Sequence, residues 1–427
     1  LDPRQPTIRL GTQLDDASSK NISDRQLLVK VAIKEKTADG SHVTGSGARD
    51  VRLFRNGSLV KVWRGDVLKG QSETTLETTI PVVSGDNRLT AYAFNRDNVK
   101  SKDAELNLVG SESLRRDGTA YILAIGINAY ENSQYNLKFA AADAQAFGEE
   151  VTRQQQKLSR YKRVEIISLS DQEATKTNII AALRRFSGVE DALPQTAPAA
   201  LKRIQTAQPE DAVLVFYAGH GTAHGLRFYL IPHDLGYQGN RSALDAAGFK
   251  TILDHSISDE ELELAVEGLD ASNLLMVIDA CNSGQALEAE EKRRGPMNSK
   301  GLAQLAYEKG MYILTAAQGY QAALESSQLG HGYLTYALIE EGLKTNAADA
   351  APKDNLVFVR EWLDFATERV PQMQEAKIKS RDLTMQSSGA TSGAQKPTVD
   401  ATSRDIQRPR VFYRREIEAK PLVVAKR

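Results

Sequence analysis

Apolar and polar positions follow one pattern in the first part of the chain, up to about residue 110. Short apolar stretches with polar partners alternate with turn residues, and none has a helical period. The dipeptide Asn56-Gly57 is a strong hairpin signal between two such stretches. The stretches that we expect to be strands lie at residues 27–33, 51–54, 58–63, 74–83 and 88–94. Short strands separated by turns predict an all-β sandwich of about 100 residues.

From Thr119 onward the pattern changes to apolar runs that alternate with amphipathic stretches. Buried strands are expected at residues 120–126, 164–169, 212–221, 274–281 and 310–315. Helices are expected at residues 137–150, 175–186, 259–267, 332–343 and 356–370. Strands that alternate with helices predict an α/β fold with a doubly wound, mostly parallel sheet and helices on both of its faces.

The two patterns divide the chain into a predicted β-sandwich, a predicted α/β domain and a C-terminal segment. We place these parts at residues 1–112, 113–384 and 385–427. The last part begins with a flexible linker, because residues 386–395 are rich in Gly, Ser and Ala. Two apolar stretches, residues 411–413 and 422–424, are then expected to dock back as strands.

Composition limits the class of protein and of partner. Lysine plus arginine (54) and aspartate plus glutamate (55) leave a net charge of −1, so we expect neither a nucleic-acid nor a membrane partner. No apolar run approaches the roughly 20 residues that a membrane-spanning helix requires. The single cysteine excludes an intrachain disulfide and cysteine-rich zinc sites. The start at Leu1 indicates a processed or truncated chain, so the compartment stays open, with the cytoplasm favoured.

Two of the predicted strands each end in a reactive side chain. The run before Cys281 delivers a thiol, and the run that ends in Gly219-His220-Gly221 delivers an imidazole. Functional sites of open α/β sheets lie outside the carboxyl ends of the strands. A neighbouring imidazole activates a thiol as a nucleophile and can later protonate the leaving amine. The backbone N–H groups of Gly221 and Cys281 are candidates to stabilise the oxyanion.

A buried, inert thiol is the alternative interpretation of Cys281, since free cysteine is among the most buried residue types. The turn Asp279-Ala-Cys-Asn-Ser-Gly284 and the Gly-His-Gly sequence on a second strand together favour catalysis.

Several motifs in order resemble the caspase-like cysteine peptidase superfamily, and most closely its bacterial metacaspase or orthocaspase branch. The resemblance covers residues 119 to about 372. Its motifs are Gly126-Ile-Asn-Ala-Tyr130, Tyr217-Ala-Gly-His-Gly221, Leu230-Ile-Pro-His-Asp234, Asp279-Ala-Cys-Asn-Ser-Gly284, Thr315-Ala-Ala-Gln318 and Gly332-Tyr-Leu-Thr-Tyr-Ala-Leu338. The stretches at residues 51–57 and 85–95 resemble the immunoglobulin-like module that precedes the peptidase in many bacterial relatives.

The resemblance implies a caspase-like fold and hydrolysis of peptide bonds through an acyl-enzyme, with Cys281 as nucleophile and His220 as acid and base. It implies no required organic cofactor. Calcium activates some related metacaspases, but the sequence has no dedicated calcium loop such as an EF-hand. The role of the sandwich is open among adaptor, cover of the active site, and docking module for a partner or an upstream sensor domain.

Asp279 distinguishes this chain from the animal caspases, whose motif is Gln-Ala-Cys-x-Gly. By strand alternation Asp279 points to the same side as Cys281, where it would repel a substrate aspartate. In the metacaspase branch this aspartate acts with a second one, and Asp143 fits that place. Two carboxylates in one pocket suit a guanidinium, so we expect cleavage after arginine, with lysine second. The alternatives are a helix-dipole role for Asp143 and a structural role for Asp279.

The segment after the nucleophile is a candidate for self-processing. Residues 288–300 are polar, charged and expected to be exposed, which is typical of sites of proteolysis. In the caspase-like family the corresponding region is often cut during activation. The candidate cleavage positions are Lys292, Arg293, Arg294 and Lys300. A solvated loop with no role in activation is the alternative.

Other histidines are weaker candidates for chemistry. His224 is expected in a glycine-bounded loop with no acidic ligands nearby, so we predict no metal site there. The remaining ones are interpreted as surface or packing residues: His42, His233, His255 and His331. Two alternative functions stay open, namely an inactive caspase-fold scaffold for protein interactions and a peptidase with a non-basic preference.

Overall fold

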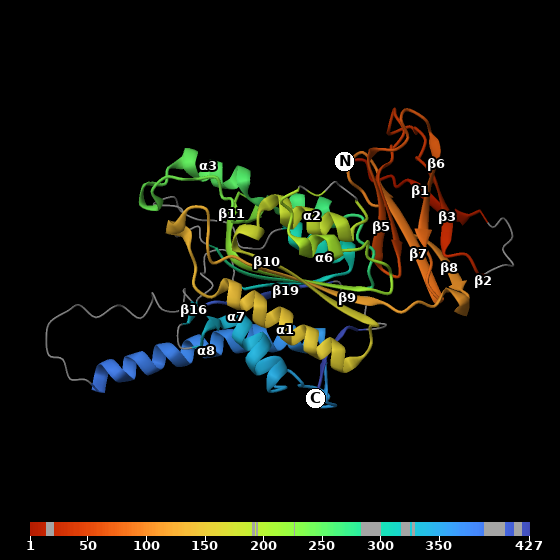
Figure 1. The fold of residues 1–427 in the computed structure, drawn as a ribbon. Helices are drawn as coiled ribbons and strands as arrows, with labels where there is room; N and C mark the ends of the chain where they lie inside the picture. The colour runs from red at the N-terminus through yellow and green to blue at the C-terminus, as the bar shows by residue number, and fades with distance from the viewer. Residues whose placement is uncertain are drawn as a thin grey trace.

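A computed structural model describes the whole chain except residues 14–20, 190–192, 194, 226, 283–299, 317–324, 327–328, 388–405 and 414–420. The front part is a β-sandwich of two sheets (Figure 1). One sheet contains β1 (Thr7–Thr12), β3 (Gln26–Lys34) and β6 (Glu73–Pro81). The other contains β2 (Asn21–Ile22), β8 (Ala104–Gly110), β7 (Gly85–Phe94), β4 (Arg49–Arg55) and β5 (Ser58–Asp66). Alternate residues of both sheets, such as Val29, Val31 and Leu53, are fully buried between them.

The predicted hairpin turn joins β4 and β5. Asn56 and Gly57 both have positive φ, 48° and 83°. A two-residue turn of this kind matches the right-handed twist of the strands it connects, which explains why an Asn-Gly pair stands here.

The second part is built on one large sheet whose central strands are parallel. Its strand order is β10-β9-β11-β14-β15-β19, and the pairs among the first five of these strands are all parallel. The strands of this sheet are β9 (Thr119–Gly126), β10 (Arg163–Ser170), β11 (Ala212–His224), β12 (Arg227–Leu230), β13 (Ile257–Ser258), β14 (Asn273–Asn282), β15 (Tyr312–Thr315) and β19 (Arg410–Phe412). The predicted mixed, mostly parallel α/β sheet is therefore confirmed.

Helices cover both faces of the large sheet (Figure 1). One face packs against α1 (Ala140–Leu158), α7 (Tyr333–Thr335), the π-helical stretch η6 (Tyr336–Lys344) and α8 (Val359–Ser387). Phe147 of α1 stacks on Phe216 of β11, with ring centroids 4.4 Å apart. The other face packs against α2 (Lys176–Phe186), α4 (Asp259–Val266) and α6 (Lys300–Lys309). None of the described helices has the length and hydropathy to cross a bilayer.

The remaining elements are short or lie at the periphery. They are α3 (Ala246–His255), β16 (Glu325–Ser326), β17 (His331–Gly332), β18 (Leu356–Phe358), β20 (Val423–Lys426), and the 3-10 turns η1 (Glu112–Leu114), η2 (Ser133–Tyr135), η3 (Asp171–Glu173), η4 (Ala199–Arg203) and η5 (Arg241–Ala243). Both apolar stretches near the C-terminus form strands: β19 pairs with β15, and β20 pairs with β18.

Several element boundaries differ from the expected ones. Helix α1 continues to Leu158 rather than residue 150, because its buried face continues through Val151 and Gln155. Residues 356–358 form a strand rather than the start of a helix, since β20 pairs with them. Helix α8 continues past Pro371 to Ser387, beyond the expected domain boundary at 384. Its Gln374 is buried and accepts a hydrogen bond from the backbone N–H of Gln407.

Strand β11 is also longer than predicted. Residues 221–224, expected as a loop, pair with β12 in antiparallel register, from Gly221↔Leu230 to His224↔Arg227. The pairing with β12 supplies the backbone hydrogen bonds that make this stretch a strand. Helices α3 and α6 were not predicted.

Ion pairs connect the sandwich to the α/β domain. Arg25 pairs with Glu210 at 2.6 Å, Arg52 with Glu308 at 2.9 Å, and Arg55 with Asp270 at 2.6 Å. The pairs lie in partly or fully buried surroundings, where screening by salt is weaker than at the surface. The sandwich is thus held against the domain by pairs at separate points of its surface.

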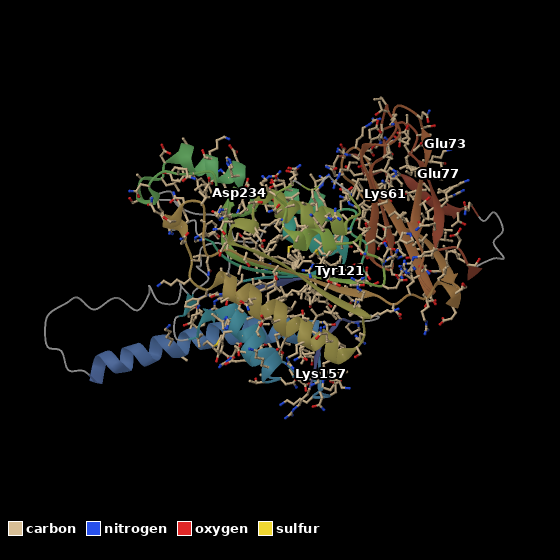
Figure 2. All side chains as sticks on the ribbon, in the orientation of Figure 1. Lys61, Glu73, Glu77, Tyr121, Lys157 and Asp234 are labelled. Carbon is tan, nitrogen blue, oxygen red and sulfur yellow. The ribbon has the colours of Figure 1, made fainter. Side chains whose placement is uncertain are left out.

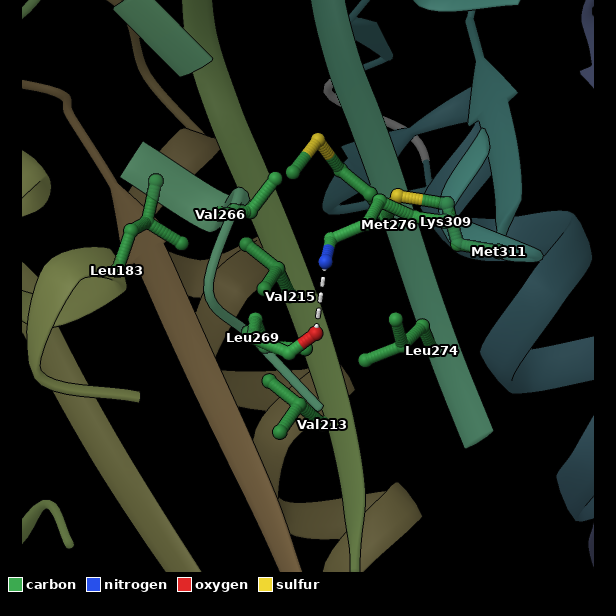
Figure 3. A pocket seen from close by; sticks show the side chains of 9 residues that line it. All are labelled: Leu183, Val213, Val215, Val266, Leu269, Leu274, Met276, Lys309 and Met311. Carbon is green, nitrogen blue, oxygen red and sulfur yellow. Dashed lines mark hydrogen bonds between the residues drawn. The ribbon is translucent and has the colours of Figure 1, made fainter. Parts of the chain in front are cut away.

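Lys309, at the end of α6, is the most enclosed charge of this junction. Its side chain is 2% exposed, and burial lowers its pKa to about 8. The Nζ donates hydrogen bonds to the carbonyls of Leu59 on β5, Leu269 at 2.9 Å and Glu267 at 2.5 Å. Figure 3 shows the amino group directed at the Leu269 carbonyl, with apolar side chains of β11 and β14 around it. One ammonium therefore satisfies carbonyls from both parts of the molecule.

We expect the substitution Lys309→Met to lower the free energy of unfolding by about 2–5 kcal/mol, because it leaves several buried carbonyls without a donor. Lys61→Met is the matched control, since Lys61 lies exposed on β5 of the β-sandwich, the strand that also contains Leu59 (Figure 2). Urea denaturation monitored by circular dichroism measures both. Equal midpoints for the two variants would contradict the role assigned to Lys309.

Candidate active site

The site is built on the pairing of β11 with β14 at their carboxyl ends. In this parallel ladder His220 and Cys281 are direct Cα partners, and Gly221 pairs with Asn282 one residue further. Neighbouring strands lie about 4.8 Å apart. The two residues singled out from separate apolar runs are therefore adjacent in the fold.

The imidazole of His220 is held by a backbone carbonyl. His220 is 5% exposed, and its Nε2 lies 2.7 Å from the carbonyl oxygen of Tyr135 in the turn η2. Because a carbonyl can only accept, Nε2 carries the proton and the lone pair of the neutral ring is on Nδ1. The backbone N–H of His220 donates to the hydroxyl of Tyr130 at 2.7 Å, and the two rings lie 5.0 Å apart. These contacts fix both the tautomer and the position of the ring.

Burial sets the charge of this histidine. It lowers the pKa of His220 to about 4, although the hydrogen bond to Tyr135 acts in the opposite direction. The ring is thus neutral near pH 7. Its Nδ1 is buried and has no hydrogen-bond partner among the described residues. The neutral ring therefore keeps its Nδ1 lone pair available, while the lowered pKa makes it a weaker base than a free imidazole.

The glycines beside His220 are required by packing. A Cβ on Gly219 would lie 2.8 Å from the Tyr217 hydroxyl and 2.9 Å from that of Tyr130. A Cβ on Gly221 would lie 3.1 Å from both Ala280 and Phe228. Any side chain at either position would displace the residues that surround the histidine.

The two aspartates predicted to share a pocket come together around Gly332. Asp143, in the first turn of α1, is 3% exposed, and Asp279, on β14, is 8% exposed. A Cβ on Gly332 would lie 3.1 Å from Asp143 Oδ2 and 3.2 Å from Asp279 Oδ2. The N–H of Gly332 donates to Asp143 Oδ2 at 3.1 Å, and the Thr335 hydroxyl donates to Asp279 Oδ2 at 2.8 Å. The two buried carboxylates therefore border the same glycine.

His331, interpreted from the sequence as a surface or packing residue, contacts one of these two aspartates. Its Nδ1 lies 2.7 Å from Asp143 Oδ1, and its side chain is 19% exposed. This contact raises the pKa of His331 above its usual value, against the opposing effect of burial. Nothing in the sequence indicated that a histidine would contact Asp143, which together with Asp279 we call the acidic pair.

The other histidines make structural contacts. His233 Nδ1 lies 2.7 Å from the Ala129 carbonyl, His255 Nδ1 lies 2.9 Å from the Thr251 carbonyl, and His42 contacts Asp39. His224 lies on β11 with its ring edge-on to Phe249. In the described part of the chain, no cluster of three or more His, Cys, Asp or Glu is arranged to hold a metal ion.

The candidate processing segment lies mostly outside the described residues. These do not include Lys292, Arg293 and Arg294. Lys300 opens helix α6, and Asn282 ends strand β14. The segment therefore connects the strand of Cys281 to the helix whose far end, Lys309, contacts the sandwich.

The residues that position the candidate groups were not predicted from the sequence. Tyr130 stands in a motif that was recognised, and Thr335 follows Gly332 in another. Neither motif indicated which atom each residue bonds. Tyr135 contributes a backbone carbonyl, which any residue type could supply, so no signal in the sequence could have identified it.

Comparisons with known proteins identify one family. A family model described as the caspase domain matches residues 119–405, which is more than half of the chain. No curated protein matches the chain.

Solved structures add no further information. Fibronectin(III)-like modules of CbhA from Clostridium thermocellum share 16% identity over 26% of this chain and 50% of that chain, with a TM-score of 0.18. A polysaccharide deacetylase from Bacillus cereus shares 9% identity over 65% of this chain and 70% of that chain, with a TM-score of 0.16. TM-scores this low support no argument on fold or function.

The lowered pKa of His220 predicts a specific dependence of stability on pH. Between pH 6.5 and 4 the unfolded state binds a proton at this residue that the folded state does not, so stability falls as the pH falls through this window. The full loss, about 3 kcal/mol, is reached below pH 4. His220→Gln, whose amide can also donate to Tyr135, removes this contribution. Unfolding free energies of wild type and variant, measured from pH 7.5 to 4, should converge toward acid pH, whereas parallel curves would refute the assignment.

Proposed function

The chain belongs to the family of cysteine peptidases that share the caspase domain, and we propose that it cleaves peptide bonds after arginine, and second after lysine, with Cys281 and His220 as its catalytic pair. The proposed specificity is supported by two buried carboxylates, Asp143 and Asp279, that both lie close to Gly332. The observation that supports the catalytic pair is the register of His220 with Cys281.

The proposed reaction begins with transfer of the Cys281 proton to Nδ1 of His220. The tautomer fixed by the Tyr135 carbonyl supports this step, because it leaves the Nδ1 lone pair available. The thiolate attacks the scissile carbonyl carbon, and a C–S bond forms as the oxygen becomes an oxyanion. The backbone N–H groups of Gly221 and Cys281 are proposed to stabilise that oxyanion.

Collapse of this intermediate breaks the C–N bond, and the imidazolium of His220 gives its proton to the leaving amine. The acyl-enzyme that remains is hydrolysed by a water molecule, which His220 deprotonates. The C–S bond then breaks, and the proton returns to the sulfur. Cys281 and His220 supply the nucleophile, the acid and the base, so the proposed reaction uses no organic cofactor. Calcium activation enters no step of it.

The acidic pair supports a basic side chain before the scissile bond. A guanidinium offers a planar set of donors that suits two carboxylates, whereas the ammonium of lysine is a more compact, strongly hydrated charge. Burial of Asp143 and Asp279 strengthens their attraction for a cation, because screening by water is weaker there. A substrate aspartate would be repelled. The proposed substrates are therefore proteins or peptides with exposed arginine or lysine.

The β-sandwich is proposed to serve as a docking module for a partner or for an upstream sensor domain. Its ion pairs to the peptidase domain, such as Arg52 with Glu308, support a fixed position beside helix α6. A partner bound to the sandwich would therefore act close to the C-terminal end of helix α6.

The specificity is tested with fluorogenic peptides that differ only in arginine, lysine or aspartate before the scissile bond. We expect arginine to be cleaved fastest and aspartate not at all. Cys281→Ala should lower kcat by at least about 10⁴-fold. Asp279→Asn should lower kcat/KM for the arginine peptide by on the order of 10²–10³-fold, because one buried charge partner of the substrate is removed.

Glu149→Gln is the control for that series, since Glu149 is an exposed carboxylate on the same helix as Asp143. It should leave kcat/KM unchanged. Faster cleavage after aspartate than after arginine, or full activity of Asp279→Asn, would refute the proposed pocket.

Self-processing within residues 288–300 is a further prediction. Purified wild-type protein should be cut after Lys292, Arg293, Arg294 or Lys300, while Cys281→Ala stays intact under the same conditions. Intact-mass spectrometry over a time course identifies the cut position. If the Cys281→Ala protein is nicked as fast as wild type, the cleavage comes from another protease and the hypothesis fails.

A further inference from the structure

One carboxylate of the acidic pair contacts a histidine. His331 Nδ1 lies 2.7 Å from Asp143 Oδ1, and the next residue, Gly332, is the one bordered by both carboxylates. The histidine and the proposed basic side chain of a substrate would therefore interact with the same carboxylate. A guanidinium that engages both oxygens of Asp143 must share Oδ1 with His331 or displace it.

The surroundings of His331 contain charges of both signs. On α1 it meets Asp143, and on η6 its Nε2 lies 3.9 Å from Glu340, which also pairs with Lys344 at 2.6 Å. Asp279 also borders Gly332. Carboxylates outnumber the single lysine among these groups, so the surroundings favour the imidazolium.

We propose that His331 is a specificity-determining residue whose imidazolium competes with the basic side chain of the substrate for Asp143. This rests on the proposed preference for arginine and lysine. Without substrate the imidazolium balances the charge of Asp143, and a substrate cation replaces it there once His331 has lost its proton. Binding of a basic substrate is thus coupled to release of a proton from this residue.

The coupling has a definite sign. The hydrogen bond to Asp143 raises the pKa of His331 above its usual value, which favours the protonated ring in the free enzyme. Below that pKa, binding of a basic side chain releases one proton, so its dissociation constant falls about tenfold for each unit of rising pH. Above that pKa the dissociation constant no longer changes. Turnover of bound substrate, and hence kcat, is not coupled to this proton.

The test uses arginine amide as the probe and the Cys281→Ala protein, in which binding is measured without catalysis. Isothermal titration calorimetry from pH 6 to 8.5 should show a dissociation constant that falls with pH and then levels. The double variant Cys281→Ala/His331→Asn keeps a side-chain donor for Asp143 without a titratable charge. It should bind more tightly at pH 6 and show little dependence on pH. The control is Cys281→Ala/His255→Asn, which replaces an exposed histidine and should behave like Cys281→Ala alone.

Two outcomes would overturn the proposal. One is an identical pH dependence with and without His331, and the other is absence of arginine amide binding at every pH. Steady-state kinetics of the protein with intact Cys281 separate this from the proposed function. If arginine peptides are cleaved and KM depends on pH in the same way for wild type and His331→Asn, the coupling is refuted and the specificity stands. Failure to cleave basic peptides, with pH-dependent binding of arginine amide, would refute the proposed function and leave the coupling standing.

Discussion

The parallel pairing of β11 with β14 is the constraint on which the candidate site depends. It fixes His220 beside Cys281, and two residues earlier on β14 it fixes Asp279. Both strands are apolar and buried on both faces, so their register depends on how individual side chains fit between the helices. Phe216, stacked on Phe147 of α1 with ring centroids 4.4 Å apart, is one such contact, and a slip by one residue would turn it to the opposite face of the sheet. The core of the sheet therefore sets the geometry of the chemistry at its edge.

Two histidines in this region have pKa values that their surroundings shift in opposite directions. His220 is enclosed and meets only a carbonyl at Nε2, and burial lowers its pKa. His331 meets a carboxylate, and the hydrogen bond to Asp143 raises its pKa. Environments that separate the protonation states of like groups are a common basis for assigning different roles to them. Here they keep the ring beside the proposed nucleophile neutral and favour the protonated form of the ring beside the proposed specificity pocket.

The sequence predicted those parts of the fold that depend on local pattern. The sandwich, the alternation of strands and helices, and the placement of His220 and Cys281 at strand ends all follow from apolar periodicity and from turn residues such as Asn56-Gly57. It did not predict contacts between segments far apart in the chain. Strand β18 exists because β20 pairs with it, and α8 continues past Pro371 where the segment after residue 405 packs on it. The carbonyl of Tyr135 and the contact of His331 with Asp143 have the same origin, since each depends on how distant segments meet.

The most direct test of the account is covalent labelling of the pocket and the nucleophile together. A peptidyl-arginine chloromethyl ketone carries both a guanidinium and an electrophile, so alkylation by it requires a reactive thiol beside a cation-binding pocket. Peptide mapping by mass spectrometry should locate the adduct on Cys281 in the wild-type protein, with no adduct on Cys281→Ala and slower labelling by the matching aspartate reagent. Labelling of Cys281 that is equally fast with the aspartate reagent, or no labelling of Cys281 at all, would contradict the account.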